Sequence, residues 1–451
     1  MIRFVSDQTR DLVATLFNSL EERKVLYVVL RNYEGLPYEI GHDIDILVAE
    51  ASVPRFRSIL SEVASGLGWF FVQVQEQFAF QSFILATRDP SKDPERAVKI
   101  DVWSPITWRG IPYCNADTIL AGKKRWNSRF PIPGPGSEAA TLLLKELLQA
   151  GKIKTCYFER IQSLASADPD GFYEALDGIF DDRIVRFLLS SSQTGDWSAL
   201  EGNYQKVRHN LIVRSSVRRP LRTILSKASF FLGHAADAAR GRRQCLICLI
   251  GPDGSGKSTL SKGILDQCSD LFGTSLYFHG HFGYIPELTR ILPRFLHAPS
   301  ETLVLGRRKK NRAARVLMYL MMSYYAAGYG IGFALLSVKR KSSRLVVFDR
   351  YFYDYAIQDE RISPDDRIFR ILCQFVPKPD LIIWPSAPAT IIHGRKPELP
   401  IAEIERQENA CRTVIGVFPG GHAIENSGPV DAATVEVRRI LLAAMKPWGS
   451  G

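Results

Sequence analysis

A glycine-rich run that also carries one lysine and three hydroxyl side chains, residues 251–259, has the composition of a phosphate-binding loop. Its glycines let backbone N–H groups converge on phosphate oxygens. Lys257 can reach the β- and γ-phosphates of a nucleotide, and the Ser258 hydroxyl can ligate Mg²⁺. We therefore expect a nucleoside triphosphate to bind to these residues: Gly251, Asp253, Gly254, Ser255, Gly256, Lys257, Ser258 and Thr259.

The segments on either side supply the elements that such a loop needs. An apolar run at 246–250 predicts a strand, and the pattern at 260–265 predicts a helix. A strand, a glycine-rich turn and a helix in this order form the context of a P-loop, and the helix N-terminus adds positive potential. The alternation of strands and helices after residue 244 predicts a parallel sheet with helices on both faces.

Polar residues near the ends of two later strands are candidates for the same site. The apolar strand predicted at 344–348 ends in Asp349, Arg350 and Tyr351, and strand-end polar residues of such sheets face the ligand crevice. Another buried strand is predicted at 380–384, followed by a helix that carries Arg395 and Lys396.

Two histidines, His279 and His281, lie two residues apart in the segment 277–284. On a strand this spacing places both on one face. They could hold an anionic or hydroxyl-rich acceptor, or a metal, or they could be surface or packing residues.

Three acidic residues in the N-terminal half have a spacing that suits metal ions. Asp43 and Asp45 project to the same side of a predicted strand, and Asp101 lies in a second apolar strand. Two carboxylates at this spacing with a distant third could hold the two Mg²⁺ ions of nucleotidyl transfer. A solvated acidic face and a domain that only binds substrate are the alternatives.

The chain of 451 residues is too long for one ordinary core. We expect an α+β domain at 1–130, a helical region at 131–240 after the breaker Pro-Ile-Pro-Gly-Pro-Gly, and an α/β domain with a parallel sheet at 241–451.

The C-terminal part, about 244–446, resembles the thymidylate-kinase-like branch of the P-loop kinases. The resemblance rests on GPDGSGKST at 251–259, Asp-Arg-Tyr at 349–351, the Pro379-Asp380 strand entry and a basic lid at Arg395-Lys396. It implies a P-loop NTPase fold that uses ATP and Mg²⁺.

The same resemblance implies roles for single residues. Lys257 and the loop amides would hold ATP, Ser258 would carry Mg²⁺, and Asp349 would assist the metal or orient the acceptor. Arg350 would bridge the donor and acceptor phosphates, while Arg395 and Lys396 would close over the transferring group. We expect acceptor contacts from Asp253, His279, His281, Phe282 and Tyr351. The histidine segment replaces the acceptor motif of a thymidylate kinase, so a nucleoside monophosphate and a sugar or glycan both stay open as acceptors.

The segment at about 10–105 resembles a polymerase-β-like nucleotidyltransferase domain, on Asp43, Asp45 and Asp101. Its glycine-serine phosphate element is absent here. The helical region that follows would fit the helical partner often seen after that fold.

Positive charge is concentrated in two segments of this chain, whose net charge is +11. Residues 206–243 hold ten Lys or Arg and one acid, and residues 307–344 hold ten and no acid. Such clusters suit nucleotides, nucleic acid or anionic lipid, so we expect possible peripheral membrane contact. The uncharged stretch 316–338 is long enough to span a bilayer, but its tyrosines and its place within the kinase-like half favour a buried helix.

The scattered cysteines and the absence of a signal peptide predict reduced thiols, no disulfide partner and a cytoplasmic location. We also expect a homo-oligomer. The leading hypothesis is an ATP- and Mg²⁺-dependent kinase. The alternatives are a bifunctional enzyme with an active nucleotidyltransferase domain, and an ATP-gated module that binds nucleic acid or an anionic membrane.

Overall fold

The computed structural model divides the chain into two compact units, one at 1–89 and 97–240 and one at 241–445. The residues that it describes are 3–4, 6–77, 79–87, 97–218, 220–221, 223–225, 227–228, 244–272, 274–282, 312–338, 344–360 and 362–445. Residues on both sides of the boundary expected at 130 belong to the first unit. Each unit is described by itself.

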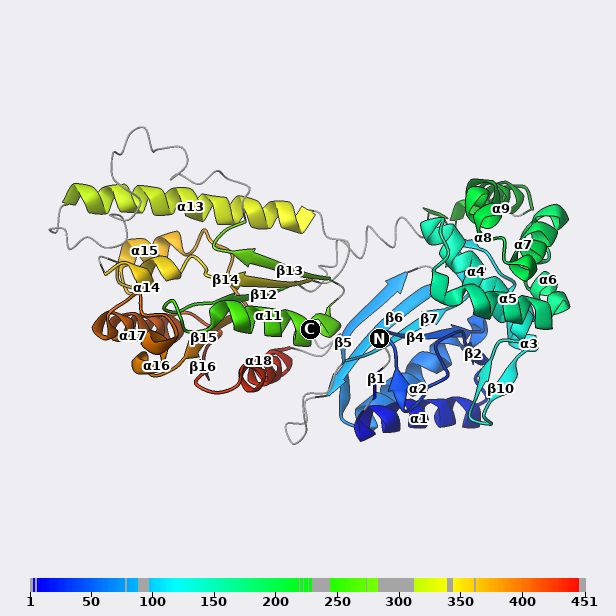
Figure 1. Cartoon of the computed structure of the whole chain (residues 1–451), viewed down its shortest axis with the longest axis horizontal. Helices are drawn as coiled ribbons and strands as arrows, with labels where there is room; N and C mark the ends of the chain where they lie inside the picture. The colour runs from blue at the N-terminus through cyan, green and yellow to red at the C-terminus, as the bar shows by residue number, and fades with distance from the viewer. Residues whose placement is uncertain are drawn as a thin grey trace. The chain divides into compact units, whose positions relative to one another are not determined.

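A mixed five-stranded sheet forms the centre of the first unit (Figure 1). Its order is β2-β4-β7-β6-β5, with β4 and β7 parallel and the other neighbours antiparallel. The strands are β2 (Tyr27–Val29), β4 (Ile44–Val48), β5 (Trp69–Gln77), β6 (Phe80–Thr87) and β7 (Val98–Trp103). Three short pairs accompany the sheet: β1 (Arg3–Phe4) with β3 (Glu39–Ile40), β8 (Thr107–Trp108) with β9 (Ile111–Pro112), and β10 (Lys124–Trp126) with β11 (Phe130–Ile132).

Helices cover both faces of this sheet. α1 (Asp7–Glu22) and α2 (Val53–Gly66) bury leucines and phenylalanines against Ile44, Ile46 and Val48 of β4. Leu47 points to the opposite face, because side chains alternate along a strand, and it packs with the helical part of the unit. That part contains α3 (Ala116–Ala121), α4 (Pro135–Ala150), α5 (Phe158–Ala167), α6 (Pro169–Leu176), α7 (Asp182–Thr194), α8 (Trp197–Gly202) and α9 (Tyr204–Arg218). The short turn η1 (Glu50–Ser52) joins β4 to α2, and η2 (Thr155–Tyr157) joins α4 to α5.

The second unit contains a five-stranded sheet in which every neighbouring pair is parallel, in the order β13-β14-β12-β15-β16. The strands are β12 (Gln244–Leu249), β13 (Thr274–His279), β14 (Arg344–Asp349), β15 (Leu381–Ser386) and β16 (Gly421–Glu425). The apolar runs of the three inner strands, β14, β12 and β15, suit strands that are buried on both sides, whereas β13 and β16 at the edges are largely accessible. The prediction of a parallel sheet in this part of the chain is confirmed.

One face of this sheet packs against α11 (Lys257–Cys268) and α18 (Val430–Ala444), which also contact each other. On the other face lie α13 (Arg312–Val338), α14 (Asp354–Gln358), α15 (Arg367–Leu372) and α17 (Ile401–Val417) (Figure 1). The remaining elements are α16 (Ala389–Arg395), which packs on α17, and η3 (Ser269–Leu271). The unit therefore has helices on both sides of its sheet.

The expectation of a buried helix at 316–338 needs correction. α13 buries Met322, Ala326 and Tyr329 against the sheet, but Leu320 and Ile331 are exposed on its other side. The absence of charge in a sequence does not tell which of its side chains will be buried. In α13, one face packs against the sheet, and residues of the other face are exposed. Among the described residues, no helix combines the length and apolar character that crossing a membrane requires.

Arg438 of α18 is almost fully buried and forms an ion pair with Asp270, at 2.6 Å. Removing one partner of a buried pair leaves an uncompensated charge. We predict that Arg438→Ala lowers the free energy of unfolding by about 3 kcal/mol in urea titrations. The matched control is Arg439→Ala, whose exposed pair with Glu436 should contribute less than about 1 kcal/mol. Equal losses in the two variants would contradict this assignment.

Candidate functional site

The loop between β12 and α11 has the backbone that its glycines predict. Gly251, Gly254 and Gly256 have φ values of 141°, 87° and 91°, in the region that only glycine adopts without strain. At Gly254 an added Cβ would lie 3.0 Å from the carbonyl oxygen of Ile392, and at Gly256 it would lie 2.4 Å from Nδ2 of Asn426. Larger residues at these positions would push the loop away from its neighbours.

Lys257 is buried at the start of α11. Its Nζ donates hydrogen bonds to the carbonyl oxygens of Gly251, at 2.6 Å, and Pro252, at 2.8 Å. The ammonium group therefore lies inside the curve of the loop, at 3.7 Å from a carboxylate oxygen of Asp253. This is the place where an anionic group would meet the loop and the N-terminus of α11.

Three cations converge on Asp253. Arg350 forms a close ion pair with it, and Nζ of Lys257 and of Lys396 each lie 3.7 Å away. Burial alone would raise the pKa of Asp253, but Arg350, Lys257 and Lys396 together hold that pKa below its ordinary value. Arg350 has a φ of 70°, a left-handed conformation that costs energy in a non-glycine residue.

Asp349 is buried at the end of β14 beside the loop. Its Oδ2 accepts hydrogen bonds from the Ser258 hydroxyl and from the Tyr277 hydroxyl, the latter at 3.1 Å. Its Oδ1 is buried and has no hydrogen-bond partner among the described residues. A buried, unpaired carboxylate oxygen next to a serine hydroxyl fits Mg²⁺, which prefers oxygen ligands.

The structure places the expected acceptor residues in two different environments. His279 is exposed, with Nδ1 3.5 Å from Asp349, and His281 lies against the ring of Tyr325. Phe282 and Tyr351 are buried in the core around Phe348. Their rings pack between α13 and the sheet, and an acceptor contact from these two residues stays a prediction. Tyr351 also donates its hydroxyl hydrogen to the carbonyl of Pro377.

Of the two lid residues, Lys396 reaches the loop and Arg395 does not contact it directly. Arg395 donates to the backbone oxygen of Asn426, at 2.9 Å. Asn426 in turn donates its side-chain N–H to the carbonyl of Ser255, at 2.7 Å. Asn426 was missed in the sequence, although it follows the last predicted strand, where polar residues of parallel sheets gather near the ligand.

Asp354 is the second residue that sequence reasoning missed. It is fully buried, and it accepts hydrogen bonds from the backbone N–H groups of Gly251, at 3.3 Å, and Tyr351, at 3.1 Å. It therefore ties the first residue of the loop to the segment that carries Arg350. The sequence does offer one indication of its role. Asp354 directly follows the aromatic run 351–353, at a position where an apolar core residue would be expected.

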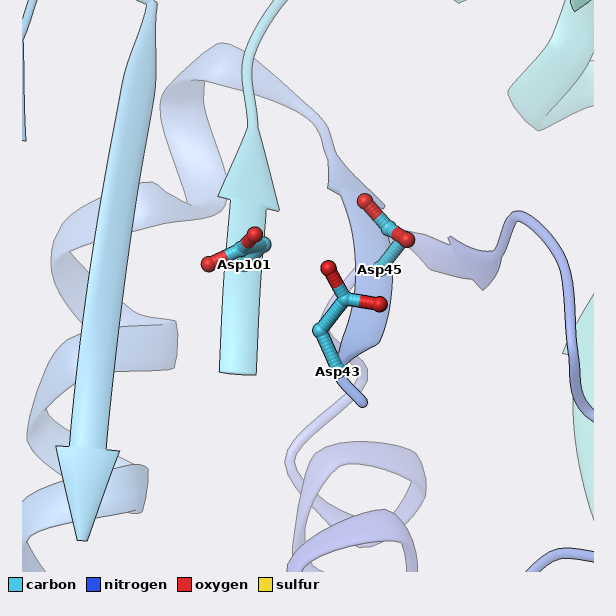
Figure 2. A group of neighbouring side chains, drawn as sticks. All are labelled: Asp43, Asp45 and Asp101. Atoms are coloured by element: carbon cyan, nitrogen blue, oxygen red, sulfur yellow. The ribbon is translucent and has the colours of Figure 1, made fainter. Parts of the chain in front are cut away.

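A second cluster lies in the first unit. Asp43, Asp45 and Asp101 place carboxylate oxygens within 4.8 Å of one another, with Asp101 on β7 and the other two on or next to β4 (Figure 2). In the parallel pairing of β4 with β7, Asp45 lies directly opposite Asp101. The structure thus brings together the three residues that the sequence singled out.

Cations already accompany these carboxylates. Arg31 pairs with Asp45 at 2.5 Å, and Nζ of Lys99 lies 2.7 Å from Asp101 and 3.7 Å from Asp43. Burial raises the pKa of Asp101 although Lys99 opposes that shift. The donor set fits a divalent cation, since its oxygens are close together, but such an ion would have to displace Lys99.

A small pocket borders this cluster and is lined by residues of the sheet and of α4, among them Arg31, Asp45, Trp103, Tyr113, Thr141 and Lys145. Burial, together with the charge of Arg31, lowers the pKa of Lys145. The helical region thus contributes side chains next to the carboxylates.

No family model matches this chain, and no curated protein matches it. One solved structure that does match is a thymidylate kinase from Ehrlichia chaffeensis, at 16% sequence identity and a TM-score of 0.29; the match covers 44% of this chain and 99% of that one. We draw no functional argument from so distant a match. The comparisons give no support for the nucleotidyltransferase resemblance, which stays a prediction.

Burial raises the pKa of Asp354 from 3.8 to about 6, which generates a prediction about stability. Between these pH values the folded chain binds more protons at this site than the unfolded chain does. Raising the pH from about 4 to about 6 should therefore remove about 2 kcal/mol of stability.

In Asp354→Asn that pH dependence should be absent, although the variant should be less stable at pH 7, because one amide nitrogen would face an N–H donor. Thermal unfolding of both proteins as a function of pH checks this. Parallel curves for the two proteins between pH 4 and 6 would rule out the assignment.

Proposed function

We propose that this chain is an ATP- and Mg²⁺-dependent phosphotransferase of the thymidylate-kinase-like class, with a nucleoside monophosphate or a sugar or glycan as acceptor. The observation that carries the proposal is the meeting of Lys257, Arg350 and Lys396 around Asp253, beside Ser258 and Asp349. All of them lie at the carboxyl ends of parallel strands, where ligands of open α/β sheets bind.

The chain's own groups fit the demands of phosphoryl transfer, which needs positioning and neutralisation of charge more than covalent catalysis. Lys257 would exchange its two loop carbonyls for phosphate oxygens. Arg350 and Lys396 would turn from Asp253 to the transferring group. Mg²⁺, held by Ser258 and Asp349, would neutralise phosphate charge.

The acceptor would contact the residues that are accessible at the edge of the sheet formed by the carboxyl ends of its strands. His279 is exposed and close to Asp349. Asp253, once it is released by the cations, could accept a hydrogen bond from an acceptor hydroxyl. These two residues support an acceptor with hydroxyl groups, and they are compatible with both acceptor classes.

We predict that Lys257→Ala lowers the rate of ADP formation by about 100-fold or more, because the variant loses the principal cation of the loop. Lys262→Ala is the matched control, since Lys262 is an exposed lysine on the same helix. ADP release should be measured with deoxythymidine monophosphate, other nucleoside monophosphates and sugars as acceptors. Turnover of Lys257→Ala at the rate of Lys262→Ala would exclude the kinase assignment.

A second candidate function is metal-dependent nucleotidyl transfer by the first unit. The specific observation in its favour is the approach of three carboxylates to within 4.8 Å. Arg31 and Lys145 on the adjoining pocket wall would suit phosphate groups.

For this candidate we predict that Lys99→Met tightens Mn²⁺ binding by about tenfold or more, because the lysine ammonium and the metal compete for the same oxygens. Asp45→Asn should abolish the binding, and Lys123→Met, which alters an exposed lysine of the same unit, should leave it unchanged. Calorimetric titration with Mn²⁺ measures all three. If Lys99→Met binds no metal and the native protein releases no pyrophosphate from nucleoside triphosphates, the candidate is excluded.

A further inference from the structure

The end of α9 and the helical residues that follow it expose aliphatic side chains in an unusual concentration. Val213 and Val217, one turn apart on α9, are 45% and 75% exposed. Leu221, Ile224 and Leu225, which share one helical face, are 76%, 64% and 65% exposed. Five large aliphatic residues exposed within 13 positions mark an interaction surface more often than an ordinary solvated face.

Local hydrogen bonding holds these side chains on the outside. The hydroxyl of Thr223 is buried and donates to the carbonyl oxygen of Ser215, at 2.8 Å, although the two residues are eight positions apart. A straight helix would separate them by about 12 Å. Thr223 therefore lies back against α9, where it is buried, while Leu221 and Ile224 are exposed.

A groove lined by cations adjoins this aliphatic surface. Val213 is part of its wall, together with Ile184 and Ile212, and the cavity has a volume of about 780 Å³. Arg109, Lys206 and His209 also line it, and no acidic residue does.

The position of Arg109 is imposed by the fold. It occupies a left-handed conformation, with φ of 50°, in the two-residue turn between β8 and β9. Its guanidinium lies over the ring of Trp108, 5.0 Å from the centroid. A stacked guanidinium keeps its N–H edge free for an anion.

The basic residues of the groove have no acidic partner within the part of the chain that the structure describes. Arg109, Lys206 and His209 form no ion pair there. Asp181, an acid at the start of α7, is already paired with Arg214, and Asp182 is paired with Arg186. The groove thus retains positive charge beside an aliphatic surface.

A ligand that satisfies both features must be anionic at one end and aliphatic at the other. We propose that this surface docks the first unit onto a bilayer that contains anionic phospholipid, with headgroup phosphates in the groove and acyl chains against the five aliphatic residues. Single-stranded nucleic acid would satisfy the cations, but its bases stack on accessible aromatic rings. The aromatic ring in this groove, Trp108, is half-buried and covered by Arg109, and the exposed side chains beside the groove are aliphatic. A partially inserted aliphatic face next to basic residues is the general form of a peripheral membrane contact.

The test uses the full chain and vesicles of phosphatidylcholine with or without one third phosphatidylserine, in a sedimentation assay. We expect binding to the anionic vesicles only. The double variant Leu221→Ser/Ile224→Ser should bind about tenfold more weakly or worse at every salt concentration. The double variant Arg109→Asn/Lys206→Gln should lose the preference for anionic lipid, and asparagine at position 109 preserves the left-handed turn.

Two control variants separate this surface from general properties of the protein. Leu67→Ser removes an exposed leucine elsewhere in the unit, and Lys124→Gln removes an exposed lysine. Both should bind as the native chain does. Undiminished vesicle binding by Leu221→Ser/Ile224→Ser overturns the proposal. A native chain that does not sediment with anionic vesicles overturns it as well. In the latter case, salt-sensitive binding of a single-stranded oligonucleotide would assign the groove to nucleic acid, and a dimer abolished by the same variant would assign the aliphatic face to a second copy.

Discussion

Parallel pairing of β12 with β14 is the constraint on which the candidate kinase site depends. The register sets Leu249 opposite Asp349, so the glycine-rich loop leaves the sheet beside the segment that carries Arg350. Parallel strands end at the same edge, and therefore residues 100 positions apart in sequence meet there. β13 adds His279 opposite Asp349. A shift of one residue in this register would turn Asp349 to the other face of the sheet and leave Ser258 without its partner.

The first unit uses the same device with a different electrostatic outcome. Parallel pairing of β4 with β7 sets Asp45 opposite Asp101, yet Arg31 and Lys99 already neutralise these carboxylates. Oδ2 of Asp45 and Oδ1 of Asp349 are both buried without a hydrogen-bond partner among the described residues, but Asp45 Oδ2 has the ion pair with Arg31. A buried charge without a partner is costly, and it persists where a ligand supplies the missing interaction. The two clusters therefore differ in how much negative charge is left for a bound cation to neutralise, even though both consist of carboxylates on parallel strands.

Much of this arrangement could be predicted from sequence, because it depends on local patterns. Apolar runs predicted the inner parallel strands, and the glycine-rich sequence predicted the turn in which Gly254 and Gly256 have positive φ. Tertiary contacts could not be predicted in this way. Phe282 is a core residue because α13 packs over it, and Asn426 contacts the loop only because β16 lies next to β15. Asp354 looks like an ordinary polar residue after an aromatic run until the fold surrounds it. Exposure of one face of α13 likewise depends on what packs against it.

The two hydrogen bonds from Lys257 to loop carbonyl oxygens have a consequence for the phosphate affinity of the loop under the proposed function. In the structure its ammonium group donates hydrogen bonds to the carbonyl oxygens of Gly251 and Pro252. Under the proposed function, a phosphate would replace these two acceptors, so the affinity would be the difference between two sets of strong hydrogen bonds. Changes that move the loop carbonyls away from Lys257 would then tighten binding without contacting the ligand, and changes that improve those hydrogen bonds would weaken it.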